Sequence, residues 1–251
     1  MFRVWLYLKI STFFSGSFSN HKIKKKKLIK DFLSKQSNKK FTALFSQCRV
    51  AFFFILKFLK NKSNKNEIVF CAYNLPEMIN IAHNLNLKVK FCDLNYQTGF
   101  IDLKQLKKRI SNKTIAIVLT NMFNNYSDSQ QIKNIAKINK ITLIEDNAIY
   151  FDNYKEGKRN KFFSGVFGDY TIYSFNIMKN ISSFYGGAAL TNDINFINFY
   201  NKEEKKLNNF SFFSLTKQII IFFILKLMSS SFMYKSFFVY NIKYSHKFNI
   251  K

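Results

Sequence analysis

Between Glu67 and Ala148 the chain alternates short apolar runs with segments of helical spacing, and this alternation constrains the fold more than any other feature. The apolar runs read EIVFCAY, KVKFCDL, TIAIVLT and ITLIEDNA, and the segments between them carry apolar residues three or four positions apart. Short strands separated by helices of this length are typical of βαβ units. The sequence therefore predicts an α/β fold with a mainly parallel sheet that is covered by helices.

Two further apolar runs follow, YTIYSF at 170–175 and GAALTN at 187–192. The stretch between them is too short for a full crossover helix, and parallel neighbours in a sheet need such a crossover. We expect this pair of strands to be a local antiparallel or looped excursion.

By composition the chain divides into three parts. Residues 1–40 form a basic segment typical of a solvated helix or linker, residues 41–200 form the large domain, and residues 201–251 form an apolar, basic helical tail. Inside the large domain, FTALFSQCRVAFFFILKFLK contains a turn-like SQCR, and the apolar stretch after it predicts one buried helix.

The net charge of +26 would suit a nucleic acid or an anionic surface as partner, but its distribution argues against nucleic acid. Residues 1–66 carry 16 basic residues against one acidic residue, and residues 202–251 carry nine against two. The middle of the chain is nearly neutral, with 15 against 11. A coding bias toward Lys, Asn, Ile and Phe explains this pattern without selection for binding. No nucleic-acid-binding motif accompanies it, so we expect no nucleic acid partner.

The three cysteines lack the spacing of a disulfide framework or of a zinc site. This usage fits a reducing compartment. The apolar N-terminal stretch is broken by Arg3 and Lys9 and resembles a signal peptide only weakly. We therefore expect a cytoplasmic protein without a metal site.

The tail at 210–240 is apolar enough to suggest a membrane helix, yet Lys217, Lys226 and Lys235 interrupt it every nine residues. No uncharged run approaches the roughly 20 residues needed to span a bilayer. The pattern favours a core or interface helix, with a peripheral helix on a membrane surface as the alternative.

The stretch LIEDNA at 143–148 is the most informative about chemistry, because it is an apolar strand that ends in two carboxylates. Ligands of open parallel sheets bind beyond the carboxyl ends of the strands, where Asp146 falls. A helix N-cap or turn is the alternative role for this residue. Further on, Lys179 follows Ser174 and precedes a Gly-Gly pair. An amine, an acid, a hydroxyl and glycines are the groups that can hold pyridoxal 5'-phosphate (PLP).

These motifs resemble the DegT-type sugar aminotransferases, which are PLP enzymes. The segment VFGDYTIYSFNIMKNISSFYGGAALTND is similar to the family signature, in which GD, SF, K, GG and TND follow one another at this spacing. LIEDNA is similar to the family's IEDAA, and FSQCRVAFFFILKFL resembles its SGRAALYxxLK. The resemblance covers about residues 41–195 and implies the aspartate aminotransferase fold, with a large α/β domain and a smaller C-terminal domain.

The resemblance implies a role for each matching position. Lys179 resembles the lysine that forms the Schiff base and moves the proton, and Asp146 resembles the carboxylate that keeps the pyridine nitrogen protonated. Ser174 resembles the phosphate-binding serine. The backbone of Cys48 and Arg49, at a helix start, resembles the family's phosphate cradle.

Four positions depart from the family pattern. Ile149 replaces a Gln or His, so a polar contact near the cofactor ring is lost, and Asn121 stands where a His is common. Cys48 replaces a glycine, which would be strained if the position needs a positive φ. The ring-stacking aromatic of the family falls at Tyr73 or Asn74; the alignment favours Asn74, whose amide stacks less well.

The resemblance implies transfer of an amino group, from glutamate, to a nucleotide-linked keto sugar in surface polysaccharide synthesis, by a homodimer. Family members continue for more than a hundred residues beyond the position that matches Lys251, so the small domain is expected to be largely missing. The alternative is a catalytically impaired or inactive PLP-fold fragment that acts as a binding or membrane-associated protein.

Overall fold

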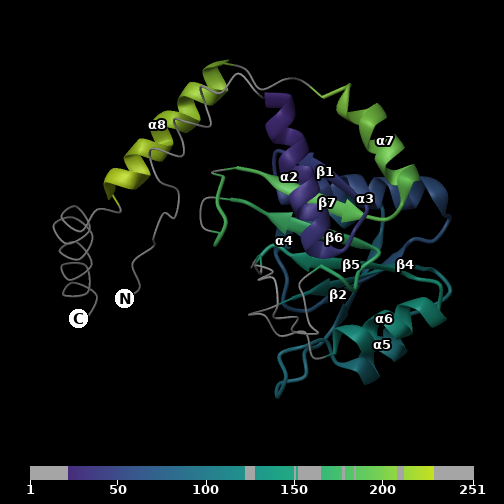
Figure 1. Ribbon diagram of the computed structural model, residues 1–251. Helices are drawn as coiled ribbons and strands as arrows, with labels where there is room; N and C mark the ends of the chain where they lie inside the picture. Colours follow the sequence, from purple (N-terminus) through teal and green to yellow (C-terminus); the bar gives the residue numbers. More distant parts are fainter. Residues whose placement is uncertain are drawn as a thin grey trace, which may run out of the picture.

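The computed structural model describes residues 22–121, 128–149, 151, 165–176, 179–183, 185–207 and 212–228. They build one seven-stranded sheet with the strand order β1-β7-β6-β5-β4-β2-β3 (Figure 1). The strands are β1 (Phe41–Phe45), β2 (Glu67–Cys71), β3 (Lys88–Cys92), β4 (Thr114–Thr120), β5 (Thr142–Asn147), β6 (Tyr170–Ser174) and β7 (Gly187–Thr191).

The sheet is mixed and mainly parallel, as the sequence predicts. The strands from β3 through β2, β4 and β5 to β6 pair in parallel, whereas β7 pairs antiparallel with both β6 and β1. The expected antiparallel excursion at 170–192 is therefore confirmed. Ser174, at the end of β6, pairs with Gly187, at the start of β7, so both lie at the edge where the parallel strands end.

Helices cover both faces of the sheet. One face carries α3 (Cys48–Lys62), α4 (Pro76–Asn84) and α7 (Ile194–Glu204), whose apolar side chains form one core with residues such as Ile144 and Ile172. The other face carries α5 (Leu103–Arg109) and α6 (Ser129–Ile138), which pack on residues such as Ile117. α2 (Lys22–Ser37) lies at the β1 and β7 end, where Leu33 belongs to a third cluster with Tyr173.

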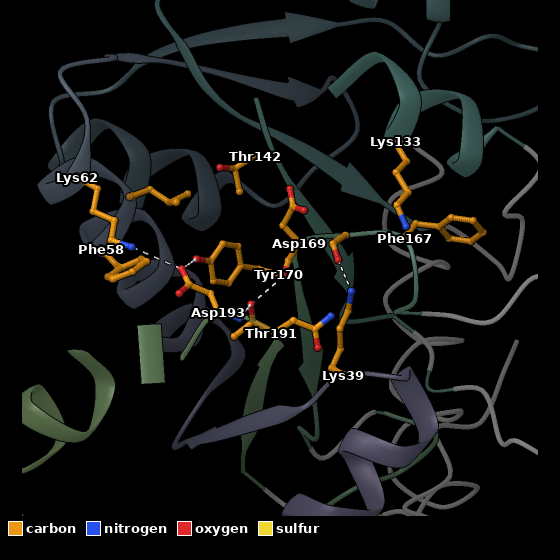
Figure 2. A pocket seen from close by; sticks show the side chains of 13 residues that line it. Lys39, Phe58, Lys62, Lys133, Thr142, Phe167, Asp169, Tyr170, Thr191 and Asp193 are labelled. Atoms are coloured by element: carbon orange, nitrogen blue, oxygen red, sulfur yellow. Dashed lines mark hydrogen bonds and ion pairs between the residues drawn. The ribbon is translucent and has the colours of Figure 1, made fainter. Parts of the chain in front are cut away.

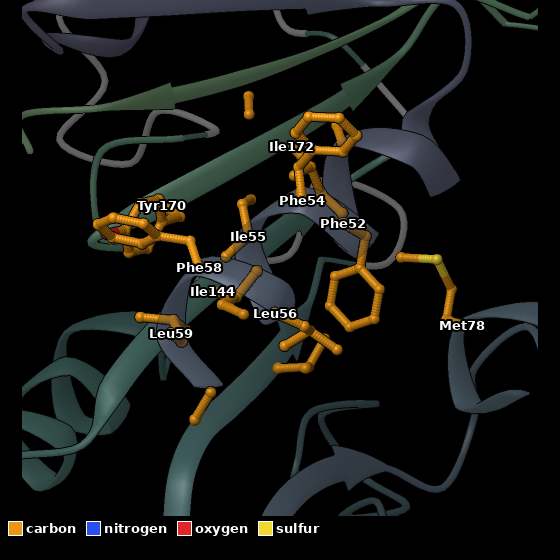
Figure 3. Packing of buried hydrophobic residues seen from close by; sticks show 14 of the residues in the cluster. Phe52, Phe54, Ile55, Leu56, Phe58, Leu59, Met78, Ile144, Tyr170 and Ile172 are labelled. Atoms are coloured by element: carbon orange, nitrogen blue, oxygen red, sulfur yellow. The ribbon is translucent and has the colours of Figure 1, made fainter. Parts of the chain in front are cut away.

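The predicted buried helix after SQCR is α3, and it is the centre of the largest core (Figure 3). Because the helix is apolar on nearly every side, it is enclosed by the sheet, α4 and α7. Edge-on ring contacts fix it on two sides, Phe52 against Phe70 of β2 and Phe58 against Phe196 of α7. Its buried residues are Cys48, Ala51, Phe52, Phe54, Ile55, Leu56, Phe58 and Leu59.

Three elements outside the alternating pattern complete the described part. FTALF at 41–45 forms edge strand β1, which the sequence analysis did not assign. The basic segment at 22–37 is a helix with most of its lysines exposed. In the tail, α8 (Phe212–Met228) projects away from the sheet, as Figure 1 shows. None of the helices in the described ranges is long and apolar enough to cross a membrane. The tail beyond 228 lies outside the described residues.

Candidate active site

A cavity of about 130 Å³ lies where the parallel strands end. Five of the six site residues that the sequence predicts line it: Cys48, Arg49, Asp146, Ser174 and Lys179. The sixth, Asn74, does not line it, although its neighbour Leu75 does. The other lining residues are Gln47, Leu75, Glu77, Met78, Ala148, Asn176, Tyr185 and Gly186. Strand ends, the α3 start and the loop after β6 thus converge on one hollow.

Asp146 is a buried acid at the end of β5, with only 5% of its surface exposed. Its Oδ1 accepts a hydrogen bond of 2.9 Å from the backbone N–H of Ala148. Burial raises the pKa of Asp146 from the ordinary 3.8 to about 6, although the Ala148 N–H and the charge of Lys179 both lower it. The contact with Ala148 is a turn contact, as the alternative role predicts. The pKa is raised because the effect of burial exceeds that of these two favourable contacts.

Glu145, the other carboxylate of LIEDNA, points to the opposite face of β5 and has a structural environment. It is fully buried, and it accepts hydrogen bonds of 2.8 to 2.9 Å from the backbone N–H groups of Gly165, Phe167 and Gly168. The side-chain amide of Asn121 donates a fourth at 2.8 Å. Adjacent carboxylates therefore differ: Glu145 is saturated with donors, whereas Asp146 faces the cavity.

Asn121, at the end of β4, holds the strand end that carries Asp146. Its backbone N–H donates to the carbonyl of Asp146 at 3.0 Å, and its side-chain amide donates to Glu145 and, at 2.7 Å, to Oδ1 of Asn147. One residue thus fixes three consecutive residues of β5. Asn121 does not line the cavity, so at this position, where the family commonly has a His, the side chain supports the strand end.

Lys179 is half-buried in the loop after β6, and its backbone N–H donates to the carbonyl of Asn176 at 2.9 Å. The next residue, Asn180, anchors this loop with two hydrogen bonds to the backbone of Phe151: it accepts from the N–H at 3.0 Å and donates to the carbonyl at 2.6 Å. The loop that bears the lysine is therefore tied to the chain that leaves β5. Ile177 and Met178, in the predicted SFNIMK motif, lie outside the described residues.

The first turn of α3 opens toward the same cavity. Gln47 is the N-cap residue and makes no side-chain cap. The helix itself gives no partner to the N–H groups of Cys48 and Arg49, whereas the N–H of Val50 donates to the carbonyl of Gln47 at 3.1 Å. Gly187 lies directly against this turn, because a Cβ added there would sit 2.4 Å from the backbone nitrogen of Cys48. Cys48 begins the helix and does not have a positive φ, so the strain considered for a residue in place of glycine does not arise.

The other positions that the sequence singles out lie at the rim of the cavity or beside it. Arg49 is exposed and lies 4.0 Å from the carboxylate of Glu77, which also lines the cavity. The amide of Asn74 donates to Oγ1 of Thr120 at 2.8 Å and accepts from the N–H of Leu75, so it braces the loop after β2. Ile149 is half-buried just after Ala148.

A second, larger cavity of about 490 Å³ lies at the opposite edge of the sheet, beside the first residues of β5 and β6 (Figure 2). None of the predicted site residues lines it. Its carboxylates already have donors: Asp193 accepts from the Tyr170 hydroxyl at 2.9 Å, and Asp169 accepts from the Leu143 N–H at 2.8 Å. The smaller cavity is the candidate site because the lysine and the buried acid meet there.

Three contacts at the site were not predicted from the sequence: those of Glu77 with Arg49, of Asn180 with Phe151 and of the Asn121 amide with β5. Glu77 and Asn180 carry no local motif, and their roles depend on which loops meet in space. Glu145 was visible as a second carboxylate, and the two-residue period of a strand indicates that it faces away from Asp146.

The sheet order and the covering helices bring Lys179 and the buried Asp146 to one cavity at the ends of the parallel strands. The solved structure of a GDP-4-keto-6-deoxymannose-3-dehydratase with a trapped PLP-glutamate geminal diamine has this fold, with a TM-score of 0.59 and 24% identity. The match covers 70% of this chain and 46% of that one.

The sequence model of the DegT/DnrJ/EryC1/StrS aminotransferase family matches residues 15–213, and the chain belongs to this family. It is 28% identical to a GDP-perosamine synthase of Escherichia coli O157:H7 over 131 residues, which are 52% of this chain and 35% of that one. It is 33% identical to a UDP-4-amino-4,6-dideoxy-N-acetyl-beta-L-altrosamine transaminase of Campylobacter jejuni, over 45% of this chain and 30% of that one. The matches thus span about a third of these two curated relatives.

Proposed function

We propose that the chain binds PLP in the smaller cavity and transfers an amino group to a nucleotide-linked keto sugar. The observation that carries this proposal is the convergence of Lys179, Asp146, Ser174 and the open first turn of α3 on one hollow. The names of the family relatives support a nucleotide-linked sugar as substrate. The trapped PLP-glutamate adduct of the dehydratase supports glutamate as amino donor.

The residues of the cavity fit this cofactor. When bound, PLP supplies an aldehyde that condenses with amines and a ring that accepts the electrons left when a Cα proton departs. Asp146 would accept a hydrogen bond from the ring nitrogen, and a cationic N–H beside it would offset the cost of its burial. Ser174 and the N–H groups of the α3 turn would hold the phosphate, which helix N-termini favour.

Lys179 would act in two ways. Its amine would hold the cofactor in the resting enzyme, and once released it would move a proton at Cα of the amino donor. The tie between Asn180 and Phe151 keeps the lysine loop near Asp146, so this proton transfer would occur over a fixed geometry.

We place the enzyme in the cytoplasm as a homodimer in surface polysaccharide synthesis, as the family resemblance implies. Two other functions have specific support. Sugar 3-dehydratases are also among the relatives, for example one of Yersinia pseudotuberculosis that is 32% identical over 107 residues. A PLP-fold protein that binds without turnover is the other, and the departures at Ile149 and Asn74 favour it.

The test combines labelling with a half-reaction. We expect borohydride reduction of the PLP-loaded chain, followed by peptide mass analysis, to place the pyridoxyl group on Lys179. Label on another lysine would refute the site. Conversion of bound PLP to pyridoxamine phosphate by glutamate, followed by an aminated sugar product, would establish the transferase. A dehydrated product would indicate the dehydratase, and labelling without conversion would indicate the binding protein.

A further inference from the structure

α8 presents an apolar face to solvent. Phe213 is 80% exposed, Ile220 58%, Ile224 50% and Leu227 61%. These positions are separated by seven, four and three residues, so they lie along one side of the helix. Phe222, on the opposite side, is fully buried. The four exposed residues Phe213, Ile220, Ile224 and Leu227 therefore form an apolar stripe along one side of the helix, which we call the α8 stripe.

The sequence that contains the α8 stripe is basic. Residues 205–251 contain eight lysines and no acidic residue. Lys217 is exposed and lies on the same side of the helix as the stripe. An apolar stripe flanked by positive charge is complementary to a surface with an anionic outer layer and an apolar interior.

We propose that the α8 stripe docks on an anionic phospholipid surface, with the helix lying in the plane of the interface. The described helix is too short to span a bilayer, because 17 residues at about 1.5 Å each reach about 25 Å, less than the hydrocarbon core of about 30 Å. Lys217 can extend its stem along the apolar surface and place its ammonium group among the phosphates.

A second copy of the chain is a poorer partner for the same stripe. Two copies would bring together two tails in which basic residues outnumber acidic ones by nine to two, in a chain whose net charge is +26. Like charges on both sides of an interface oppose association, whereas an anionic lipid surface attracts them. This proposal is independent of the chemistry in the cavity.

The experiment is vesicle co-sedimentation of the full chain with phosphatidylcholine vesicles, with and without phosphatidylglycerol. We expect binding to the anionic vesicles that weakens as salt is raised. The double variant Ile220→Gln/Ile224→Gln should lower the partition coefficient about tenfold or more, because it removes apolar area from the stripe while keeping every charge. Lys217→Gln should lower it about fivefold.

Matched controls come from exposed residues elsewhere. Ile138, on α6, is 79% exposed, and Lys104, on α5, is exposed, so Ile138→Gln and Lys104→Gln should bind like the parent. Circular dichroism establishes that each variant is folded. Equal binding by the double variant and the parent would overturn the proposal, as would equal binding to neutral vesicles. Self-association without vesicle binding, measured by sedimentation velocity, would assign the stripe to a second copy instead.

Discussion

Replacing Asp146 by asparagine should stabilise the cofactor-free chain at neutral pH. The unfolded carboxyl has its ordinary pKa of 3.8, and burial raises the pKa in the folded chain to about 6. Between these pH values the folded chain holds a proton that the unfolded chain has released, so the free energy of unfolding falls as pH rises and stays lower above about pH 6. At about 1.4 kcal/mol per pKa unit, the buried charge costs about 3 kcal/mol at neutral pH.

Asparagine has nearly the same shape and no charge. We therefore expect Asp146→Asn to raise the free energy of unfolding by up to about 3 kcal/mol near pH 7.5, with the difference shrinking toward pH 4. The assay is urea unfolding of PLP-stripped protein, followed by far-UV circular dichroism across this pH range. Added PLP should reverse the order, because only the parent can pair a carboxylate with the cofactor ring.

Glu145→Gln is the matched control, one residue away and equally buried. It replaces an acceptor that receives four hydrogen bonds, so it should destabilise the chain by about 2–4 kcal/mol at all of these pH values. We therefore expect the two substitutions to change the free energy of unfolding in opposite directions, although the carboxylates are adjacent. If Asp146→Asn leaves the stability near pH 7.5 unchanged or lowers it, then Lys179 already compensates the buried charge, and the reasoning is wrong.

Two further predictions concern packing around the cavity. Gly187→Ala should lower the free energy of unfolding by about 1–3 kcal/mol or more and weaken PLP binding, because the added Cβ would meet the backbone of Cys48. Denaturant unfolding measures the first effect and a PLP titration the second. An unaltered denaturation midpoint would contradict the close approach of Gly187 to Cys48. The thiols of Cys48, Cys71 and Cys92 are buried and burial raises the pKa of each, to about 12 for Cys92, so all three should react with a thiol reagent only slowly in folded protein. Rapid labelling of any of them without denaturant would show that the core is open.

Much of the fold could be predicted because each parallel strand carries its own local signal. The predicted strand TIAIVLT has the same bounds as β4, since a continuous apolar run flanked by polar turns suits a strand that is buried on both faces. FTALF gave no such signal. It is a strand only because β7 lies beside it, and that neighbour is far away in the sequence.

The site shows the same limit. Asp146 was predicted from the end of an apolar strand and Lys179 from the resemblance of its motif to the family signature, and both line the cavity. Asn74 was expected beside the cofactor, but its amide is committed to Thr120, a partner on another strand. The hydrogen bonds between the Asn180 side chain and the backbone of Phe151 were not predictable. In the sequence, an asparagine that bonds to a distant backbone looks like any other polar loop residue.

The position of β7 between β6 and β1 has a consequence for how the chain reaches its native state. β1 pairs with β7 from Phe41↔Thr191 to Phe45↔Gly187. Of the described strands, the first to be synthesised therefore cannot pair until the last has been synthesised. Until then the aromatic side of α3 has no complete cover. Such a long-range closure slows folding and leaves apolar surface open to aggregation. We expect the nascent domain to depend on chaperones until Thr191 has emerged, and arrest of synthesis before that residue should leave a protease-sensitive intermediate.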